Sequence, residues 1–369
     1  MSAPTRHGIW RGLTLGERLM LGLLGCVPLA LFFHFTHRPV AAFALACLGV
    51  VPLAGYMGKA TEMLAHRAGS GVGGFLNATF GNAAELIIAL VALHSGNITL
   101  VKASVTGSII GNILFVLGAA VVAGGWGHKR QSFNLTAASV SSSMMLLSVI
   151  ALALPALFHT FIPPDRLPHI ENDMSLAIAL VLLALYGLSL LFNLRTHKHL
   201  YCESETHAGE GLWSLRLSVG ILSAATGGVG ILAEILVRGL EPTLASFGFT
   251  ETFVGVVIIA IIGNAAEHST AVRMAVKDRM NLSFTIAMES SKQIALFVAP
   301  VLVLAGRLFG PNADGDLMNL DFAPMEVLAV TVSVFMVSSI IHDGETNWME
   351  GALLLGVYLI LAAGFYFIP

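Results

Sequence analysis

The chain has 369 residues, of which 56% are hydrophobic and 11% are charged, and its formal net charge is −3. A soluble domain of this size usually carries about twice that share of charged residues, so the composition indicates a membrane protein without a sizeable soluble domain. The small net charge and the lack of a basic, aromatic-rich cluster exclude nucleic acid as a partner.

Apolar runs long enough to cross about 30 Å of hydrocarbon as helices recur along the whole chain. The first run has no convincing small-residue cleavage site, so we expect a retained helix rather than a signal peptide. Lys and Arg gather in alternate connections, which predicts a cytoplasmic N-terminus and, for an odd number of spans, a C-terminus on the other side. The expected fold is an all-α polytopic membrane protein with about eleven spans, near residues 19–36, 39–57, 72–93, 98–124, 135–160, 174–194, 213–238, 252–276, 282–306, 324–342 and 348–368.

A pentapeptide, GNAAE, occurs in both halves of the chain, beginning at Gly81 and again at Gly263. The most polar connection, residues 195–211, separates the later ten spans into two sets of five, and GNAAE has a matching place in each set. In the first half a glycine-rich loop is expected just before it. Because five is odd, the second set must enter the membrane from the opposite side, which is the inverted-repeat arrangement of secondary transporters.

The predicted organisation follows from this repeat. It consists of an N-terminal tail with an extra first helix (1–37), a first repeat (38–194), a polar linker rich in His and Glu (195–212) and a second repeat (213–369). For the linker, both regulation by pH or calcium and a simple solvated connection stay open.

Within each motif the Asn and the Glu are three residues apart, so on a helix Asn82 with Glu85, and Asn264 with Glu267, would share a face. An unpaired carboxylate in mid-bilayer is costly and should face a cavity, a cation or a partner. Inversion would bring Glu85 and Glu267 together in a midplane site of oxygen ligands. The alternative is a packing motif, in which Gly and Ala allow close helix contact and a protonated Glu bonds across the interface.

A site of oxygen ligands suits a hard divalent cation such as Ca²⁺. The missing thiolates and the scarcity of His near both motifs argue against a zinc or copper site. Two close carboxylates in hydrocarbon can also take protons, because their mutual repulsion and the low dielectric favour the neutral form. A site that holds either the cation or protons, but not both, meets the physical requirement for antiport.

Polar side chains in neighbouring spans are weaker candidates. Ser108 and Asn112 are four apart in the fourth span, and Ser290, Ser291 and Gln293 hold a comparable place in the ninth. We expect Ser108, Asn112, Ser291 and Gln293 to be secondary ligands, although such residues also often bond adjacent helices to each other.

Three further residues are candidates for a proton path. Glu62 and Glu234 lie in the second and seventh spans and would either relay protons or form structural pairs. His268 follows Glu267 but points to another side of the helix, so it is either a packing histidine or a proton carrier.

With these residues in view, the chain resembles the cation/proton exchanger (CAX) family of the calcium/cation antiporter superfamily. The resemblance extends over nearly all of spans two to eleven. It is carried by LNATFGNAAELIIALVAL, VKASVTGSIIGNILFVLG, GNAAEHSTAV, SSKQIALFVAPVLVL and DGETNWMEG.

The resemblance implies a Ca²⁺/H⁺ antiporter of ten core helices in two inverted repeats, preceded by an extra helix. It also implies that Glu85 and Glu267 carry both Ca²⁺ and protons. One feature departs from the family pattern, because Glu289 and Lys292 flank the stretch before Gln293. Being three apart on one helix face, they could neutralise each other, whereas a Lys292 directed into the cavity would repel a divalent cation.

The expected function is therefore exchange of Ca²⁺, with other divalent cations left open, for H⁺ by alternating access. No cofactor is expected, and the partners are Ca²⁺, H⁺ and the lipid bilayer of a bacterial inner membrane or an organelle. A divalent-cation channel with a paired-carboxylate constriction is the alternative. An enzyme that uses the two glutamates as acid and base is disfavoured because no nucleophile or metalloprotease motif accompanies them. The oligomeric state stays open, a homo-oligomer included.

Overall fold

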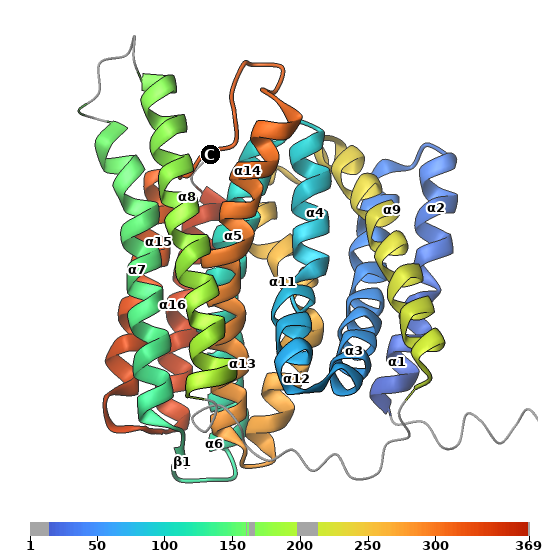
Figure 1. Cartoon of the computed structure of the whole chain (residues 1–369). Helices are drawn as coiled ribbons and strands as arrows, with labels where there is room; N and C mark the ends of the chain where they lie inside the picture. The colour runs from blue at the N-terminus through green and yellow to red at the C-terminus, as the bar shows by residue number, and fades with distance from the viewer. Residues whose placement is uncertain (1–14, 160, 162–166, 198–212, 368–369) are drawn as a thin grey trace, which may run out of the picture.

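The computed structural model describes residues 15–159, 161, 167–197 and 213–367, and these residues are nearly all helical (Figure 1). Four π-helical segments (η2, η3, η5 and η6) interrupt or extend the α-helices among them. The elements of the first half are α1 (Leu15–Leu24), α2 (Cys26–Phe35), α3 (Pro39–Phe80), α4 (Ala83–His94), α5 (Ile98–Ile110), η2 (Gly111–Val116), α6 (Leu117–Gly125), β1 (Gln131–Ser132), α7 (Leu135–His159), α8 (Leu167–Leu191) and η3 (Phe192–Thr196).

The second half follows the same scheme of long helices with π-helical interruptions. Its last helices are joined by a 3₁₀ turn, η7, and by strand β2, which pairs antiparallel with β1 from the first half. The elements are α9 (Leu215–Phe247), α10 (Glu251–Phe253), η5 (Val254–Ile259), α11 (Ala260–Gly263), α12 (Ala265–Val276), α13 (Met280–Gln293), η6 (Ile294–Val298), α14 (Ala299–Phe309), α15 (Pro324–Ile340), η7 (Ile341–Asp343), β2 (Glu345–Thr346) and α16 (Trp348–Phe367).

The helices confirm an all-α, multi-pass membrane fold. In the described ranges, 9 helical runs are long and apolar enough to cross a membrane, and a pair bent by 62°, Glu251–Gly263 with Ala265–Val276, makes up to 10. Helix α4 is apolar but, at 12 residues, about 18 Å long, so it completes a crossing only together with the last turns of α3. Helix α1 begins at the lower end of the bundle and the chain ends near the upper one, as an odd number of crossings requires (Figure 1).

The glycine-rich stretch before the first GNAAE does not form the predicted loop. Residues from Pro39 to Phe80 form one helical element, α3, but the chain folds back on itself within it. A Cβ added to Gly73 would lie 2.2 Å from the carbonyl oxygen of Ala65, whereas residues eight apart in a straight helix are separated by about 12 Å. Only glycine allows this approach, which returns the last turns of α3 to a position beneath α4 (Figure 1).

Two predicted spans are longer in the structure. Helix α8 begins at Leu167 rather than near 174, because the charge of Glu171 has partners and does not end the span. Helix α9 continues to Phe247 rather than 238 and ends at Gly248, whose φ of 69° is the left-handed conformation of a helix C-cap. The helical segment before the predicted linker (195–212) continues to Thr196, two residues into it. Most of the linker, residues 198–212, lies outside the described part of the chain.

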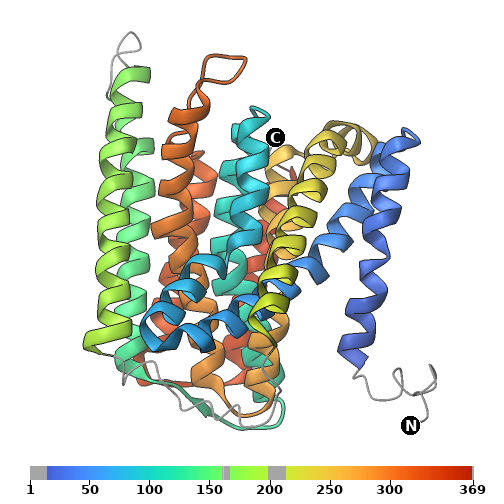
Figure 2. The same ribbon diagram turned by 45° about the vertical axis from the view of Figure 1, so that its right-hand side comes forward.

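The helices of the two halves pack against each other throughout the bundle. Helix α3 lies along α9, α14 along α8, and α16 along α6. In both views α7 and α8 lie at one edge and α1 with α2 at the other (Figures 1 and 2). A close approach joins α5 to η5, where a Cβ on Gly107 would lie 2.3 Å from the carbonyl oxygen of Val256. Small residues at this crossing bring the polar residues of α5 next to the second GNAAE motif.

Candidate cation site

Each GNAAE motif lies where a helix breaks. Asn82 follows the end of α3 and precedes α4, with φ −100° and ψ 29°. Asn264 separates α11 from α12 with φ −92° and ψ 4°, at the 62° bend. Asn82 and Asn264 are thus the N-cap residues of α4 and α12, and Glu85 and Glu267 lie three residues on, in the first turn of each helix.

The side chain of Glu85 lies near the second break. A Cβ on Gly263, the first residue of the second motif, would lie 3.2 Å from Cγ of Glu85 and 3.6 Å from its Oε1, so the Glu85 side chain lies against the other motif. The carboxyl groups of Glu85 and Glu267 are close enough to interact electrostatically. In the described part of the chain, Oε2 of each glutamate is buried and has no hydrogen-bond partner. A buried carboxylate oxygen without a donor is costly, and a proton or a cation would satisfy it.

A small cavity of about 10 Å³ adjoins Glu85. Its polar lining comes from Glu85, Ser104 and Ser108, and the backbone of Gly263 closes one side. A volume of this size holds about one water-sized particle. The space beside Glu85 is thus suited to a single small ion or water and is too small for an organic ligand.

Asn82 joins the first motif to the second half of the chain. Its Nδ2 donates to Oε1 of Gln293 at 2.9 Å, and its Oδ1 accepts from the Ser290 hydroxyl at 3.1 Å. Both partners lie on α13, and Asn82 and Ser290 are buried. The first break is therefore held by a helix that follows the second break in sequence.

Asn264 makes the reciprocal connection. Its Nδ2 donates to the Ser108 hydroxyl at 3.1 Å, and its Oδ1 accepts from Nδ2 of Asn112 at 3.2 Å. Asn112 also donates to the Ser290 hydroxyl at 2.8 Å, which links the two sets of contacts into one buried network. Each motif asparagine thus binds the opposite half, and the amide oxygens expected beside the carboxylates serve as acceptors in this network.

Ser290, rather than Ser291, takes part in the network. The Ser291 hydroxyl donates to the backbone carbonyls of Ala287 and Ile109, at 3.1 and 3.3 Å, and so joins α13 to α5. Ser108, Asn112 and Gln293 do lie among the motif residues, as expected from the sequence. The sequence pattern could not show which of the two serines, Ser290 or Ser291, faces the motif residues, because neighbouring residues differ by only about 100° around a helix.

The three candidates for a proton path, Glu62, Glu234 and His268, lie on three different helices. Glu234 is paired with Arg238, four residues on, at 2.7 Å on a half-exposed face of α9. Glu62 lies partly buried on α3. The rings of His268 and Phe115 pack edge to face, with centroids 5.9 Å apart, and within the described residues the buried Nε2 of His268 has no partner. Glu234 is therefore not brought to the two motif glutamates.

Lys292 is directed away from the motif glutamates. It is 1% exposed and forms an ion pair with Glu289, three residues earlier. Glu289 also accepts from the Ser141 hydroxyl on α7 at 3.2 Å and from Asn193 at 3.4 Å. Of the two alternatives for Lys292, the structure has the ion pair with Glu289, and the pair is held on the side of α13 that contacts α7 and η3.

Helices broken at mid-membrane, with ionisable side chains at the breaks, are the architecture of secondary transporters. The chain belongs to the sodium/calcium exchanger protein family, whose sequence profile matches residues 38–195 and 217–367. The resemblance to its cation/proton exchanger branch, inferred above from the motifs, is confirmed by the relatives and structures that follow.

The chain is 45% identical to a protein of Aphanothece halophytica named Ca(2+)/H(+) antiporter, with 95% of this chain and 97% of the relative covered. It is 40% identical to the Ca(2+)/H(+) antiporter ChaA of Bacillus subtilis, with 92% and 96% covered. It is 36% identical to the vacuolar calcium ion transporter of Schizosaccharomyces pombe, with 94% and 84% covered.

Solved structures agree with this assignment. Native YfkE superposes with a TM-score of 0.81 at 36% identity, over 95% of this chain and 100% of that one. The H+/Ca2+ exchanger CAX superposes with a TM-score of 0.66, over 95% and 92%, but at 14% identity, so it supports the fold alone. The chain is an integral, multi-pass membrane protein of this fold.

Proposed function

We propose that this protein exchanges Ca²⁺ for H⁺ across its membrane, by alternating access, at a site formed by Glu85 and Glu267. The names of the relatives support the pair of ions, since three of them from bacteria are called Ca²⁺/H⁺ antiporters. The geometry supports the site. The observation that carries it is the pair of buried carboxylate oxygens, Oε2 of Glu85 and of Glu267, that have no hydrogen-bond partner in the described residues.

Charge balance explains why such a pair would exchange the two ions. Two ionised carboxylates carry two negative charges, which one Ca²⁺ neutralises, and protonation of both carboxyls neutralises them equally well. Either loaded state is then electrically neutral and can rearrange within the hydrocarbon region, whereas the empty ionised pair is disfavoured there. Because the cation and the protons compete for the same oxygens, binding of one drives release of the other.

The two inverted repeats, residues 38–194 and 213–369, would supply the movement. In support, each half has a break at its GNAAE motif and a π-helical segment, η2 or η6, in the following crossing. The family profile also matches the two halves as separate segments. Asn82 and Asn264 each bond to the opposite half, so a change in the relative position of the halves would change both breaks together.

We place the protein in a bacterial inner membrane, because the relatives with 40% identity or more are bacterial. The vacuolar relatives are 34 to 36% identical, which makes an organelle membrane the second choice.

The test is coupled flux in proteoliposomes. With equal free Ca²⁺ on both sides, vesicles with an acidic interior should accumulate Ca²⁺ while their interior becomes alkaline, and both net fluxes should stop when a protonophore removes the pH gradient. A divalent-cation channel would instead carry Ca²⁺ only down its own gradient and would not accumulate it in response to the pH gradient. Ca²⁺ entry that is unaffected by the protonophore would refute antiport and favour the channel.

A further inference from the structure

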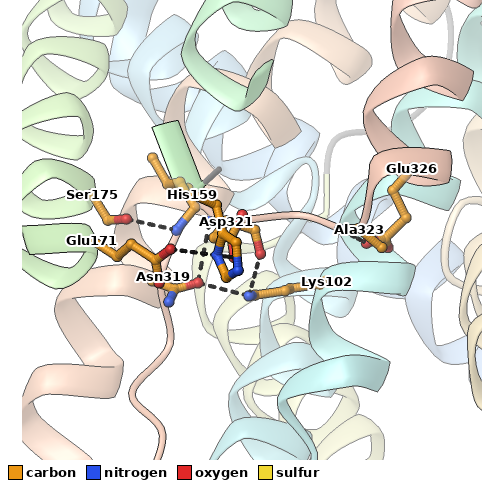
Figure 3. A network of polar contacts seen from close by, with 9 residues as sticks. Lys102, His159, Glu171, Ser175, Asn319, Asp321, Ala323 and Glu326 are labelled. Carbon is orange, nitrogen blue, oxygen red and sulfur yellow. Dashed lines mark hydrogen bonds and ion pairs between the residues drawn. The ribbon is translucent and has the colours of Figure 1, made fainter. Parts of the chain in front are cut away.

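A second group of ligand-type side chains lies at the upper end of the bundle in Figure 1, where α7 ends and α8 begins. His159 is the last residue of α7, Glu171 lies near the start of α8, and Asp321 belongs to the connection between α14 and α15. Figure 3 shows the three side chains converging. His159 Nδ1 lies 2.6 Å from Glu171 Oε1 and 3.4 Å from Asp321 Oδ2, and one ligand atom of each residue lies within 4.8 Å of the others.

The surroundings hold these groups in place before any ligand arrives. The backbone N–H of Leu320 donates to the Ser175 hydroxyl at 3.0 Å, and that of Asp321 donates to Oδ1 of Asn319 at 3.1 Å. Lys102 Nζ donates to the same Asn319 oxygen and to the backbone carbonyl of Asp321 (Figure 3). The connection is thus fixed to α8 and α5 by contacts that leave the Asp321 carboxylate to face His159.

The charges nearby leave room for a cation. The Lys102 ammonium interacts most strongly with the carboxylate of Asp321 and then with those of Glu326 and Glu171. Its one positive charge offsets one of these three and leaves two negative charges. The Glu326 carboxylate accepts from Thr106 and from the backbone N–H of Ala323, whereas Glu171, only 6% exposed, and Asp321 both face one imidazole. A divalent cation would neutralise the two remaining charges, whereas a protonated His159 would neutralise only one.

We propose that His159, Glu171 and Asp321 bind a divalent transition-metal ion of the zinc type. One imidazole nitrogen and two carboxylate oxygens, with a fourth position for water, is a donor set that zinc accepts. Ca²⁺ prefers six to eight oxygens and no nitrogen, so the cargo ion of the proposed transport site is a poor match here. The half-exposed side of His159 gives an ion access from solution.

The distances fit this assignment with little movement. At metal to ligand distances of about 2.0–2.1 Å, two ligands of a tetrahedral site are about 3.3 Å apart. The 3.4 Å between His159 and Asp321 already matches that value. The 2.6 Å between His159 and Glu171 is a hydrogen bond, and it must open by less than 1 Å when the metal replaces the shared proton.

The test measures metal binding directly on purified, tag-free protein in detergent. Zn²⁺ is titrated in competition with a chromogenic zinc indicator for the wild type, His159→Gln and Asp321→Asn. His169→Gln is the matched control, since His169 is an exposed histidine on the same helix, two residues before Glu171. Other histidines bind zinc weakly, so the quantity of interest is the difference between variants.

We expect the wild type and His169→Gln to bind one Zn²⁺ with the same affinity, and a millimolar excess of Ca²⁺ not to displace it. His159→Gln and Asp321→Asn should each weaken that binding by tenfold or more. Co²⁺ added to the wild type should give the visible absorption of a tetrahedral ion, and Zn²⁺ should remove it. Equal zinc affinity in all four proteins, or no tight zinc binding in a wild type that still exchanges Ca²⁺, would overturn the proposal and leave a histidine–carboxylate ion pair. The assay measures equilibrium binding, so its failure would not bear on the transport site.

Discussion

The contact between α5 and η5 makes Gly107→Ala the most informative test of how the two halves hold the site. The new Cβ would lie 2.3 Å from the backbone carbonyl oxygen of Val256 and 2.5 Å from its Cα. Non-bonded heavy atoms need about 3.5 Å, and a backbone atom cannot rotate away, so the two segments must separate by about 1 Å.

That separation acts directly on the network at the second break. Ser108 follows Gly107 and accepts from Asn264 at 3.1 Å, so a shift of about 1 Å exceeds the range of a hydrogen bond. Overpacking of this kind costs about 1–3 kcal/mol, and a lost interhelical bond in a membrane protein costs about 0.6–1.7 kcal/mol. Gly107→Ala should therefore destabilise the protein by about 2–5 kcal/mol.

Gly111 provides the matched control. It lies four residues further along the same crossing and is also buried, but a Cβ added there meets no atom of the described chain within 4 Å. Thermal unfolding in detergent and Ca²⁺/H⁺ exchange in proteoliposomes should both be impaired by Gly107→Ala, the exchange by tenfold or more. Gly111→Ala should stay within twofold of the wild type in exchange. Equal behaviour of the two variants would refute the argument from close approach.

Three more outcomes are expected. Ca²⁺ uptake should follow a pH gradient and ignore a Na⁺ gradient, because neither GNAAE motif itself contains a hydroxyl residue; uptake driven by Na⁺ at constant pH would contradict this. Glu234→Gln should retain measurable exchange, since Glu234 is paired with Arg238 away from the motif glutamates, and complete loss in a well-folded protein would count against that placement. Glu289→Gln should lower the stability by about 3–5 kcal/mol, because it leaves the buried Lys292 without its counter-charge, and adding Lys292→Met should recover most of the loss in a thermal unfolding assay.

The sequence predicted the membrane fold well because long apolar runs have few alternatives to transmembrane helices. The sequence-based prediction failed where a helix changes direction without a proline or another helix-end signal to mark the place. No proline marks either GNAAE motif, so the breaks at Asn82 and Asn264 could not be distinguished from continuous helix. The reversal near Gly73 was not predicted either, because composition cannot tell a glycine-rich loop from a helical segment that folds back.

The candidate site was predicted in its residues but not in its contacts. Repetition of GNAAE identified Asn82, Glu85, Asn264 and Glu267, yet the partner of Asn82, Ser290, lies 208 residues away and was not chosen over Ser291. The cluster of His159, Glu171 and Asp321 was missed for a related reason. His159 and Glu171 lie on the helices that flank one connection and Asp321 belongs to another, far along the chain, and the charge at position 171 was taken as lying outside the span.

The central claim is that Glu85 and Glu267 form one site that holds either Ca²⁺ or protons. The direct measurement is Ca²⁺-dependent proton release from proteoliposomes for the wild type, Glu85→Gln, Glu267→Gln and the double variant, with size-exclusion profiles to confirm folding. Gln keeps the size and one oxygen of Glu but cannot be ionised or take up a proton. Each single variant should therefore abolish exchange, and the double variant should be no worse, as for residues that act as a unit. Near-normal exchange in either well-folded single variant would contradict the shared site and return GNAAE to a packing motif.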